Sequence, residues 1–307
     1  MDSLRIDSLL ENVRCNICGQ SDFSVIRASN YAEFSSINQF IEIYRSSSDI
    51  RLFDQLVKCT KCQLVYLNPR ISNEIAFKGY QEAIDYRHHY EDPYREKSFR
   101  RAMRKVEKIL GGFCGSSAQR SLIDIGCAGG VFVKVALDLG FDATGLEPSR
   151  YLANYGKEKY QVSIMPKTIE ESDLPHDSID FVSMWDVLEH LPDPTSTLSL
   201  VDELLKKSGV LILNLPMVDT LPARILGKRW PFYLNVHTYY FDKRTIRLLL
   251  DKTGFSIIGM RRYWQSLSLG YVCERAGITL PQILRKLSSV SFRYYMGQRT
   301  IVAKKIT

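Results

Sequence analysis

The segment LIDIGCAGG, residues 122–130, constrains the fold of this chain more than any other part of the sequence. An apolar run reaches Asp124, and small residues then occupy position 126 and positions 128–130, ahead of the apolar segment VFVKVALDLG. This pattern predicts a buried strand, a tight turn and a helix. Small residues in the turn let a ligand approach the backbone, and the helix start offers unpaired amides to an anionic group.

A carboxylate follows this turn at Glu147, in the sequence GLEPS. It lies about 20 residues further on, at the end of the next predicted strand, where a carboxylate can accept hydrogen bonds from ribose hydroxyls. A dinucleotide fingerprint requires Gly-x-Gly-x-x-Gly, but Gly126 is followed by Ala128 and Val131. The spacing therefore disfavours a nicotinamide cofactor. A tight turn without any ligand stays open as an alternative, because one glycine-rich turn is weak evidence.

Strands and helices are predicted to alternate from residue 121 onward. The predicted strands cover residues 121–125, 142–146, 162–165, 179–184, 209–214, 255–262 and 299–304, and the predicted helices cover 130–139, 149–159, 195–207 and 242–253. This order predicts an α/β fold with a doubly wound, seven-stranded, Rossmann-like parallel sheet. The turn at Gly126, Glu147, Asp186 and Asn214 all fall at carboxyl ends of strands, where such sheets bind ligands.

Four of the seven cysteines form two CxxC pairs, in RCNICGQ and KCTKCQL. The pairs are Cys15 with Cys18 and Cys59 with Cys62, and they suit a tetrahedral zinc ion. Disulfides and a redox-active CxxC fit less well, because a reducing compartment disfavours the first and the second needs no duplicate. The gap of about 40 residues exceeds that of an ordinary zinc ribbon. It predicts an insertion, with a hairpin or short helix within residues 28–56.

Net charge and hydropathy restrict the functions and locations that remain possible for this chain. Four thiolates with one divalent ion carry about −2, which lowers the formal net charge of +7 to about +5. This is modest, and a helix rich in Lys and Arg, such as residues 94–108, is usually a solvated face. No apolar run has the length of a signal peptide or a transmembrane helix, so we expect no transmembrane segment and a cytoplasmic location.

Taken together, these motifs resemble those of class I S-adenosylmethionine-dependent methyltransferases. Asp124, Gly126 and Gly130 match the family motif Asp/Glu-x-Gly-x-Gly-x-Gly, and Ala128 replaces the middle glycine. That replacement is mild if Ala128 keeps a negative φ. The resemblance implies a ribose contact for Glu147. The further positions that it implies for the cofactor are Ile169, Trp185, Asp186 and His190.

This resemblance implies three parts of the chain. Residues 1–70 would form a zinc-binding module of two CxxC knuckles with an insertion, residues 71–118 a helical connector, and residues 119–307 the S-adenosylmethionine-binding methyltransferase domain.

Two histidines are candidates for the chemistry of the acceptor. His190, in VLEHLPDP, either holds the loop after the fourth strand or faces the methyl group. His237 lies in WPFYLNVHTYYF, either in a lid over the strand ends or packed among core tyrosines.

The segments CTKCQLVYLNPR, AIDYRHHY and NVHTYYFDKRTIRLLLDKTGF are similar to bacterial methyltransferases that carry an N-terminal zinc module and act on sugars. That group includes C-methyltransferases of nucleotide-linked keto-sugars. The similarity implies that Tyr86 and His237 assist deprotonation of the acceptor carbon. Tyr80, Tyr90 and Tyr94 lie close to Tyr86 in the sequence and are alternatives to it.

The leading hypothesis is therefore methyl transfer to a small acceptor, such as a nucleotide-linked sugar or glycan intermediate. A second hypothesis is methylation of RNA or another macromolecule held by the basic helix 94–108. It is disfavoured because WDVLEH replaces the Asn/Asp-Pro-Pro-aromatic motif of base-amine methyltransferases, and no aromatic stripe accompanies the basic residues. A third is a non-catalytic zinc and cofactor-binding partner protein, which the retained Asp124, Glu147 and candidate base disfavour.

Overall fold

A seven-stranded sheet forms the centre of the computed structural model, which describes residues 6–31, 44, 51–82, 88–112, 119–275 and 287–306. The strand order is β12-β15-β10-β9-β6-β7-β8. In this order the strands are β12 (Phe255–Arg262), β15 (Gln298–Lys305), β10 (Leu205–Pro216), β9 (Ile179–Trp185), β6 (Ser121–Ile125), β7 (Asp142–Leu146) and β8 (Ile164–Met165).

The sheet is mixed, and this corrects the expectation of a parallel sheet. Neighbouring strands from β8 to β10 are parallel, whereas β15 is antiparallel to both β10 and β12. The chain leaves β12 through an arm of two short strands, β13 (Gln265–Ser268) and β14 (Ser291–Tyr294), and re-enters the sheet between β12 and β10. The last strand therefore runs opposite to its neighbours, and the alternation prediction is wrong for it.

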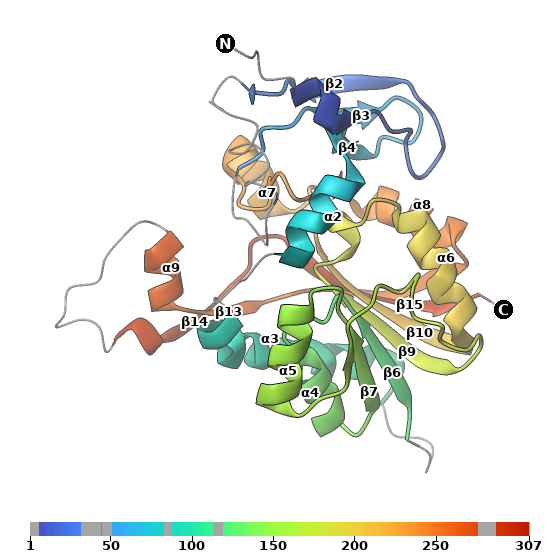
Figure 1. Cartoon of the computed structure of the whole chain (residues 1–307), viewed down its shortest axis with the longest axis vertical. Helices are drawn as coiled ribbons and strands as arrows, with labels where there is room; N and C mark the ends of the chain where they lie inside the picture. Colours follow the sequence, from blue (N-terminus) through green and yellow to red (C-terminus); the bar gives the residue numbers. More distant parts are fainter. Residues whose placement is uncertain are drawn as a thin grey trace.

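Helices cover both faces of the sheet, as predicted (Figure 1). Residues of α3 (His88–Leu110), α4 (Val131–Asp138) and α5 (Arg150–Tyr160) share one core with Leu122, and residues of α6 (Pro194–Leu204) and α8 (Lys243–Lys252) share the other with Ile123. Successive residues of a strand point to opposite faces, so the apolar strand β6 supplies both cores. Burial of each such side chain contributes about 1.5–3 kcal/mol.

The largest differences from the predicted boundaries lie where α6 meets β10 and at the start of β8. The helix predicted at 195–207 ends at Leu204, because Leu205 is extended and pairs with Ile179 in β9. The strand predicted at 162–165 contains only Ile164–Met165. Its start is delayed because α5 ends in a left-handed residue, Gln161 with φ 55°, and the chain needs residues beyond it to turn back to the sheet edge.

The N-terminal part forms a separate small sheet above the carboxyl ends of the main strands (Figure 1). Its strands are β2 (Phe23–Arg27), β3 (Leu56–Cys59) and β4 (Val65–Leu67), and β11 (Tyr239–Tyr240) from the C-terminal part completes it beside β4. The turn η1 (Ile6–Leu9) leads into β1 (Leu10–Glu11), which pairs with β5 (Arg70–Ile71). Of the predicted insertion, residues 32–43 and 45–50 lie outside the described residues.

Several elements connect the two sheets. The helix α2 (Asn73–Glu82) lies between the small sheet and the α5 side of the large one (Figure 1). After β10 come α7 (Leu221–Leu226) and η4 (Gly227–Arg229), η3 (Leu188–His190) follows β9, and α9 (Leu269–Arg275) follows β13. Among the residues that the structure describes, no helix is long and apolar enough to span a membrane.

Candidate active site and cysteine centre

The four cysteines of the two CxxC pairs converge on one point of the N-terminal part. Their sulfur atoms all lie within 4.8 Å of one another. The Sγ atoms of Cys15 and Cys62 are 3.3 Å apart, and those of Cys18 and Cys59 are 3.5 Å apart. These separations are too long for an S–S bond of about 2.05 Å, and they approach the spacing of thiolates around zinc with Zn–S bonds of about 2.3 Å. The donor set and its geometry therefore fit a tetrahedral zinc ion.

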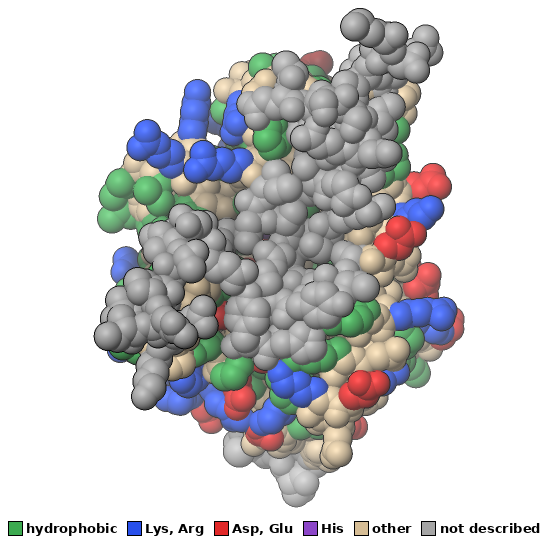
Figure 2. Space-filling model, turned by 60° about the vertical axis from the view of Figure 1, so that its left-hand side comes forward, with side chains coloured by type: hydrophobic (Ala, Val, Ile, Leu, Met, Phe, Trp, Pro, Cys, Tyr) green, Lys and Arg blue, Asp and Glu red, His purple; other side chains and the backbone are tan. Residues whose placement is uncertain are grey.

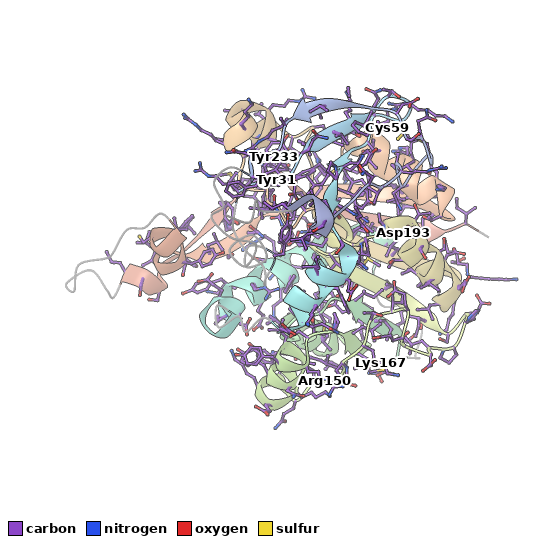
Figure 3. The ribbon with its side chains drawn as sticks, turned by 45° about the horizontal axis from the view of Figure 1, so that its top comes forward. Tyr31, Cys59, Arg150, Lys167, Asp193 and Tyr233 are labelled. Carbon is purple, nitrogen blue, oxygen red and sulfur yellow. The ribbon has the colours of Figure 1, made fainter. Side chains whose placement is uncertain are left out.

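The two knuckles have the same backbone geometry. The residue after each pair, Gly19 or Gln63, is left-handed, with φ 71° or 67°. Its amide donates to the carbonyl of the first cysteine, from Gly19 to Cys15 at 2.8 Å and from Gln63 to Cys59 at 3.1 Å. Figure 3 shows Cys59 in this part of the molecule, far from Arg150 at the start of α5. The same local hydrogen bond thus shapes each CxxC turn so that its cysteines point toward those of the other pair.

The turn after β6 packs tightly against neighbouring strands. Gly126 has φ 66°, and a Cβ atom there would lie 2.6 Å from Cγ2 of Val187. Gly130 has φ 75°, and a Cβ atom there would lie 2.8 Å from Cγ2 of Val162. In both cases the missing side chain makes room for protein atoms. Ala128 has φ 48°, so the negative φ that would make its replacement of glycine mild is not present; the turn holds its amide toward Glu147.

Glu147 lies fully buried at the end of β7. Its Oε2 accepts the amide of Ala128 at 2.9 Å, and its Oε1 accepts the amide of Ser149 at 2.8 Å. The hydroxyl of Tyr80, from α2, lies 3.1 and 3.2 Å from the two carboxylate oxygens. Burial raises the pKa of Glu147 to about 7, and the three hydrogen bonds oppose this rise. The carboxylate is thus fixed in orientation by the glycine turn that it faces.

Two further acids lie at the same edge. Asp124 accepts the Ser183 hydroxyl at 2.6 Å, and burial raises its pKa to about 8. Asp186 has φ 57°, and its Oδ1 accepts Asn214 Nδ2 at 2.8 Å and Gln298 Nε2 at 2.7 Å. Burial raises the pKa of Asp186 to about 6, and those two hydrogen bonds lower it. As predicted from the strand ends, Asp186 and Asn214 come together.

A small cavity opens beside Trp185 and Asp186. It encloses about 60 Å³ and is lined from α3 by Arg95, Ser98 and Phe99, with further lining residues at Tyr263 and 265–267. The positive charge of Arg95 lowers the pKa of both Asp124 and Asp186, against the larger effect of burial. Arg95 was not among the residues predicted from the sequence. The signal that could have identified it is a basic residue on a helix that packs over the carboxyl ends of strands carrying acidic residues.

His190 and His237 lie next to each other on the other side of the β9 end. Their rings meet edge to face with centroids 4.6 Å apart. Nδ1 of His190 lies 2.9 Å from the carbonyl oxygen of Val236, and Nδ1 of His237 lies 2.9 Å from that of Phe232. A carbonyl only accepts, so each Nδ1 carries the proton and each Nε2 keeps its lone pair.

Glu189 completes this group, which we call the Glu-His-His cluster (Glu189, His190 and His237). One ligand atom of each residue lies within 4.8 Å of the others, which is close enough to share a cation. Both carboxylate oxygens of Glu189 are buried without a hydrogen-bond partner in the part of the chain that the structure describes. Burial lowers the pKa of His190 to about 4 and holds that of His237 well below its usual range. Both rings are therefore neutral at pH 7 and can accept a proton.

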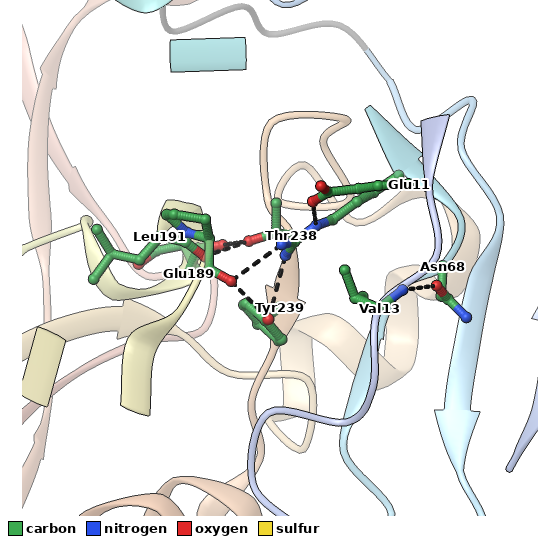
Figure 4. A network of polar contacts seen from close by, with 9 residues as sticks. Glu11, Val13, Asn68, Glu189, Leu191, Thr238 and Tyr239 are labelled. Atoms are coloured by element: carbon green, nitrogen blue, oxygen red, sulfur yellow. Dashed lines mark hydrogen bonds and ion pairs between the residues drawn. The ribbon is translucent and has the colours of Figure 1, made fainter. Parts of the chain in front are cut away.

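Backbone contacts tie the segment of His237 to the loop after β9 (Figure 4). The amide and hydroxyl of Thr238 donate to the Glu189 carbonyl at 2.8 and 3.0 Å, and its hydroxyl also lies 3.1 Å from the Leu191 carbonyl. Tyr239 then pairs with Tyr66 in the small sheet. The segment of His237, for which a lid was one of two alternatives, is thus a connection fixed between the two sheets, and His237 is only 4% exposed.

The remaining predicted positions have different outcomes. Tyr86 lies outside the described residues, so its predicted role stays a prediction. Ile169 is buried in the core on the α6 side of the sheet. The side chain of His176, in the turn before β9, is 72% exposed.

The basic helix α3 does not form an isolated positive stripe. Arg100 pairs with Glu96 at 2.8 Å and also with Asp138 of α4. Figure 2 shows one face of the molecule, and over its lower part Lys and Arg side chains are interspersed with Asp and Glu. A separate group of basic side chains lies at the upper left of this face. This favours the solvated-face interpretation of residues 94–108.

Known proteins share this fold and part of this sequence. A methyltransferase-domain family model matches residues 94–259. The ubiquinone biosynthesis O-methyltransferase of Alkalilimnicola ehrlichii is 29% identical over 115 residues, which cover 36% of this chain and 45% of that protein. The Escherichia fergusonii enzyme of the same name is 31% identical over 110 residues, 34% of this chain and 44% of that protein. The chain thus matches less than half the length of these curated relatives.

One solved structure illustrates the likeness in fold. An S-adenosylmethionine-dependent methyltransferase from Archaeoglobus fulgidus superposes with a TM-score of 0.50 at 19% identity, over 72% of this chain and all of that chain.

Proposed function

The chain belongs to the methyltransferase-domain family, as a class I S-adenosylmethionine-dependent methyltransferase, and from this premise we propose that it methylates a small acceptor that must first lose a proton. The observation that carries the proposal is the Glu-His-His cluster. Two neutral imidazoles with free Nε2 atoms and a carboxyl group without a partner are a costly arrangement to bury unless they act on a ligand.

The cofactor's contacts follow from the strand ends. Glu147 would accept the ribose hydroxyls, and the amides at the start of α4 would face the polar atoms of the cofactor. Arg95, across the small cavity from Asp186, provides a positive charge for a carboxylate. Bound S-adenosylmethionine supplies an electrophilic methyl group on a sulfonium, so positioning provides much of the rate enhancement.

His237 is the proposed general base. Its Nδ1 donates to the Phe232 carbonyl, which fixes the tautomer and leaves Nε2 to take a proton from the acceptor. Burial raises the pKa of the neighbouring Glu189 well above its usual range, so this carboxyl would balance the positive charge on the ring only once it has lost its own proton. Tyr86 remains a candidate for the same step.

The proposed acceptor is a sugar or glycan intermediate, such as a nucleotide-linked keto-sugar. Support comes from the cysteine centre and from the similarity of the His237 segment to zinc-containing sugar methyltransferases. The tetrathiolate geometry supports a zinc ion bound by Cys15, Cys18, Cys59 and Cys62, with a structural role.

A phenolic hydroxyl is the second candidate acceptor, and the O-methyltransferase relatives favour it. Both acceptors need a base, so His237 would serve either. RNA has less support, because Arg100 of α3 is paired with two acids, and Arg101 and Lys105 donate to backbone carbonyls.

The test uses the purified enzyme with S-adenosylhomocysteine and a keto-sugar nucleotide in deuterated water. A C-methyltransferase exchanges the hydrogen beside the ketone for deuterium, and His237→Gln abolishes this exchange while the wild type retains it. With S-adenosylmethionine the wild type places the methyl group on that carbon. Methylation of a catechol without any carbon exchange would instead support the hydroxyl acceptor, and no product from either class would contradict the small-molecule proposal.

A further inference from the structure

We propose that the Tyr80 hydroxyl occupies the acceptor positions of the Glu147 carboxylate that the ribose of the cofactor would use. The cofactor then binds by displacing this hydroxyl, and Tyr80 thereby sets the cofactor affinity. The inference deepens the proposed function, because it rests on Glu147 as the ribose-binding acid. It assigns to α2, a helix outside the matched methyltransferase region, a direct effect on the donor site.

The hydrogen bonds around Glu147 leave no vacant place for ribose. A carboxylate has about four acceptor positions. The amides of Ser149 and Ala128 take one on each oxygen, at 2.8 and 2.9 Å. The Tyr80 hydroxyl straddles the other two, at 3.1 and 3.2 Å, and Glu147 is 0% exposed. Two ribose hydroxyls need the same positions that the one phenol now holds.

The two amide contacts and the phenol contact differ in origin. Ala128 and Ser149 belong to the turn and the helix start that flank Glu147 in the same sheet, so their amides stay in place when a ligand arrives. Tyr80 comes from a helix 67 residues away in the sequence. Of the three donors, only the phenol comes from an element outside the turn and helix that border Glu147.

The phenol is held as a donor. Burial raises the pKa of Tyr80 well above its usual range, and the charge of Glu147 raises it further, so the hydroxyl keeps its proton. A ribose hydroxyl donates to a carboxylate in the same way. Cofactor binding at this position is therefore an exchange of one hydroxyl donor for two, and only the difference between them contributes to affinity.

The N-terminal part positions Tyr80. Ile75 and Ala76 of α2 pack against the cluster of Ile6, Tyr44 and Ile71, which belongs to the N-terminal part of the chain. The amide of Ser72, directly before α2, donates to the Leu9 carbonyl at 2.9 Å. One end of α2 is thus anchored to η1 and the β1–β5 pair, while Tyr80 reaches the large sheet. The N-terminal part, through α2, is placed to influence how readily the donor site opens.

The test compares Tyr80→Phe with the wild type by calorimetric titration of S-adenosylhomocysteine. Phenylalanine keeps the ring and removes only the competing hydroxyl. We expect about threefold to tenfold tighter binding, the range for one net hydrogen bond. The matched control is Tyr160→Phe, which removes a hydroxyl that donates to the Asp92 carboxylate at 2.7 Å and should leave affinity unchanged. Weaker or equal binding by Tyr80→Phe would overturn the proposal.

Wild-type kinetics provide a second measurement that needs no variant. If Tyr80 must leave first, the observed association rate levels off as S-adenosylhomocysteine concentration rises. A rate that rises linearly throughout would overturn the displacement step. The variant Glu147→Ala distinguishes the ribose assignment of Glu147 from the competing role of Tyr80. If this variant leaves cofactor affinity unchanged, the ribose assignment itself fails. If it weakens binding while Tyr80→Phe has no effect, only the role of Tyr80 fails.

Discussion

His237 meets His190 edge to face at a centroid distance of 4.6 Å, and each ring donates its Nδ1 proton to a backbone carbonyl. Two separate segments, the loop after β9 and the connection that follows η4, thus bring two unprotonated Nε2 atoms together beside Glu189. Neither ring carries a charge at neutral pH, so each Nε2 has a lone pair that can take a proton from an acceptor.

Replacement of His237 by Gln should lower turnover by about 10²- to 10⁴-fold, the usual contribution of a general base. Affinity for S-adenosylhomocysteine should stay within about twofold, because His237 lies apart from the Glu147 contacts. Steady-state kinetics and calorimetry measure the two effects separately. His176→Gln is the control, since that exposed side chain lies outside the site. Equal loss of turnover and binding would indicate a purely structural role for His237.

Cofactor binding should weaken as the pH falls through about 7. Burial raises the pKa of Glu147 to about 7, and protonation there removes an acceptor that ribose needs. Between pH 8 and pH 6 the dissociation constant of S-adenosylhomocysteine should rise roughly tenfold, if only the ionised form binds. Titration at several pH values tests this. Glu147→Gln cannot titrate, so a dependence that persists in it would have to come from another group, such as Asp124 or Asp186.

The raised pKa of Glu147 also determines how this residue changes the stability of the folded chain with pH. The pKa of Glu147 is higher in the folded chain than the ordinary value of 4.5. The folded state therefore binds this proton more tightly, and Glu147 should reduce stability as the pH rises from about 4.5 to about 7. Urea denaturation of the wild type and Glu147→Gln across this interval should show the variant losing less stability. An equal loss in both would contradict the raised pKa.

Elemental analysis should find about one zinc ion per chain, bound by the cysteine centre. Conversion of Cys15 and Cys59 to Ser should release it and lower the unfolding temperature, because a structural metal stabilises only the folded chain. Cys273→Ser is the matched control, since this cysteine of α9 lies outside the centre. A stably folded wild type without metal would exclude the zinc assignment. If the metal is lost from His237→Gln but retained by the cysteine variant, the metal site would instead be assigned to the Glu-His-His cluster.

Gly126→Ala should destabilise the chain by about 1–3 kcal/mol. Its φ of 66° strains an L-residue, and the added Cβ would lie 2.6 Å from Cγ2 of Val187. Urea unfolding measures the change. Val187→Ala in the same chain should recover the part due to the contact but not the part due to backbone strain. No recovery in the double variant would show that strain alone is responsible.

The features that follow from local sequence were predictable. The strand, turn and helix around Gly126 and the position of Glu147 depend on neighbouring residues, and a CxxC turn places its own cysteines. The left-handed Ala128 was not predictable, because the fold around Glu147 imposes a conformation that alanine alone avoids.

The contacts between distant segments were also not predictable. Tyr80 reaches Glu147 across 67 residues, and β11 joins the small sheet beside β4. The antiparallel β15 depends on an arm between strands that carries no periodic signal. Pattern arguments describe which residues share a face of one element, whereas these relationships depend on how separate elements pack together.

The most direct test of the account is the affinity of Glu147→Ala for S-adenosylhomocysteine, measured by calorimetry at pH 8 beside the wild type. Loss of the ribose contact should cost about 1–3 kcal/mol, which corresponds to roughly fivefold to 150-fold weaker binding. Circular dichroism of the variant confirms that it is folded. A folded variant that binds as tightly as the wild type would contradict the assignment of this strand end as the methyl-donor site.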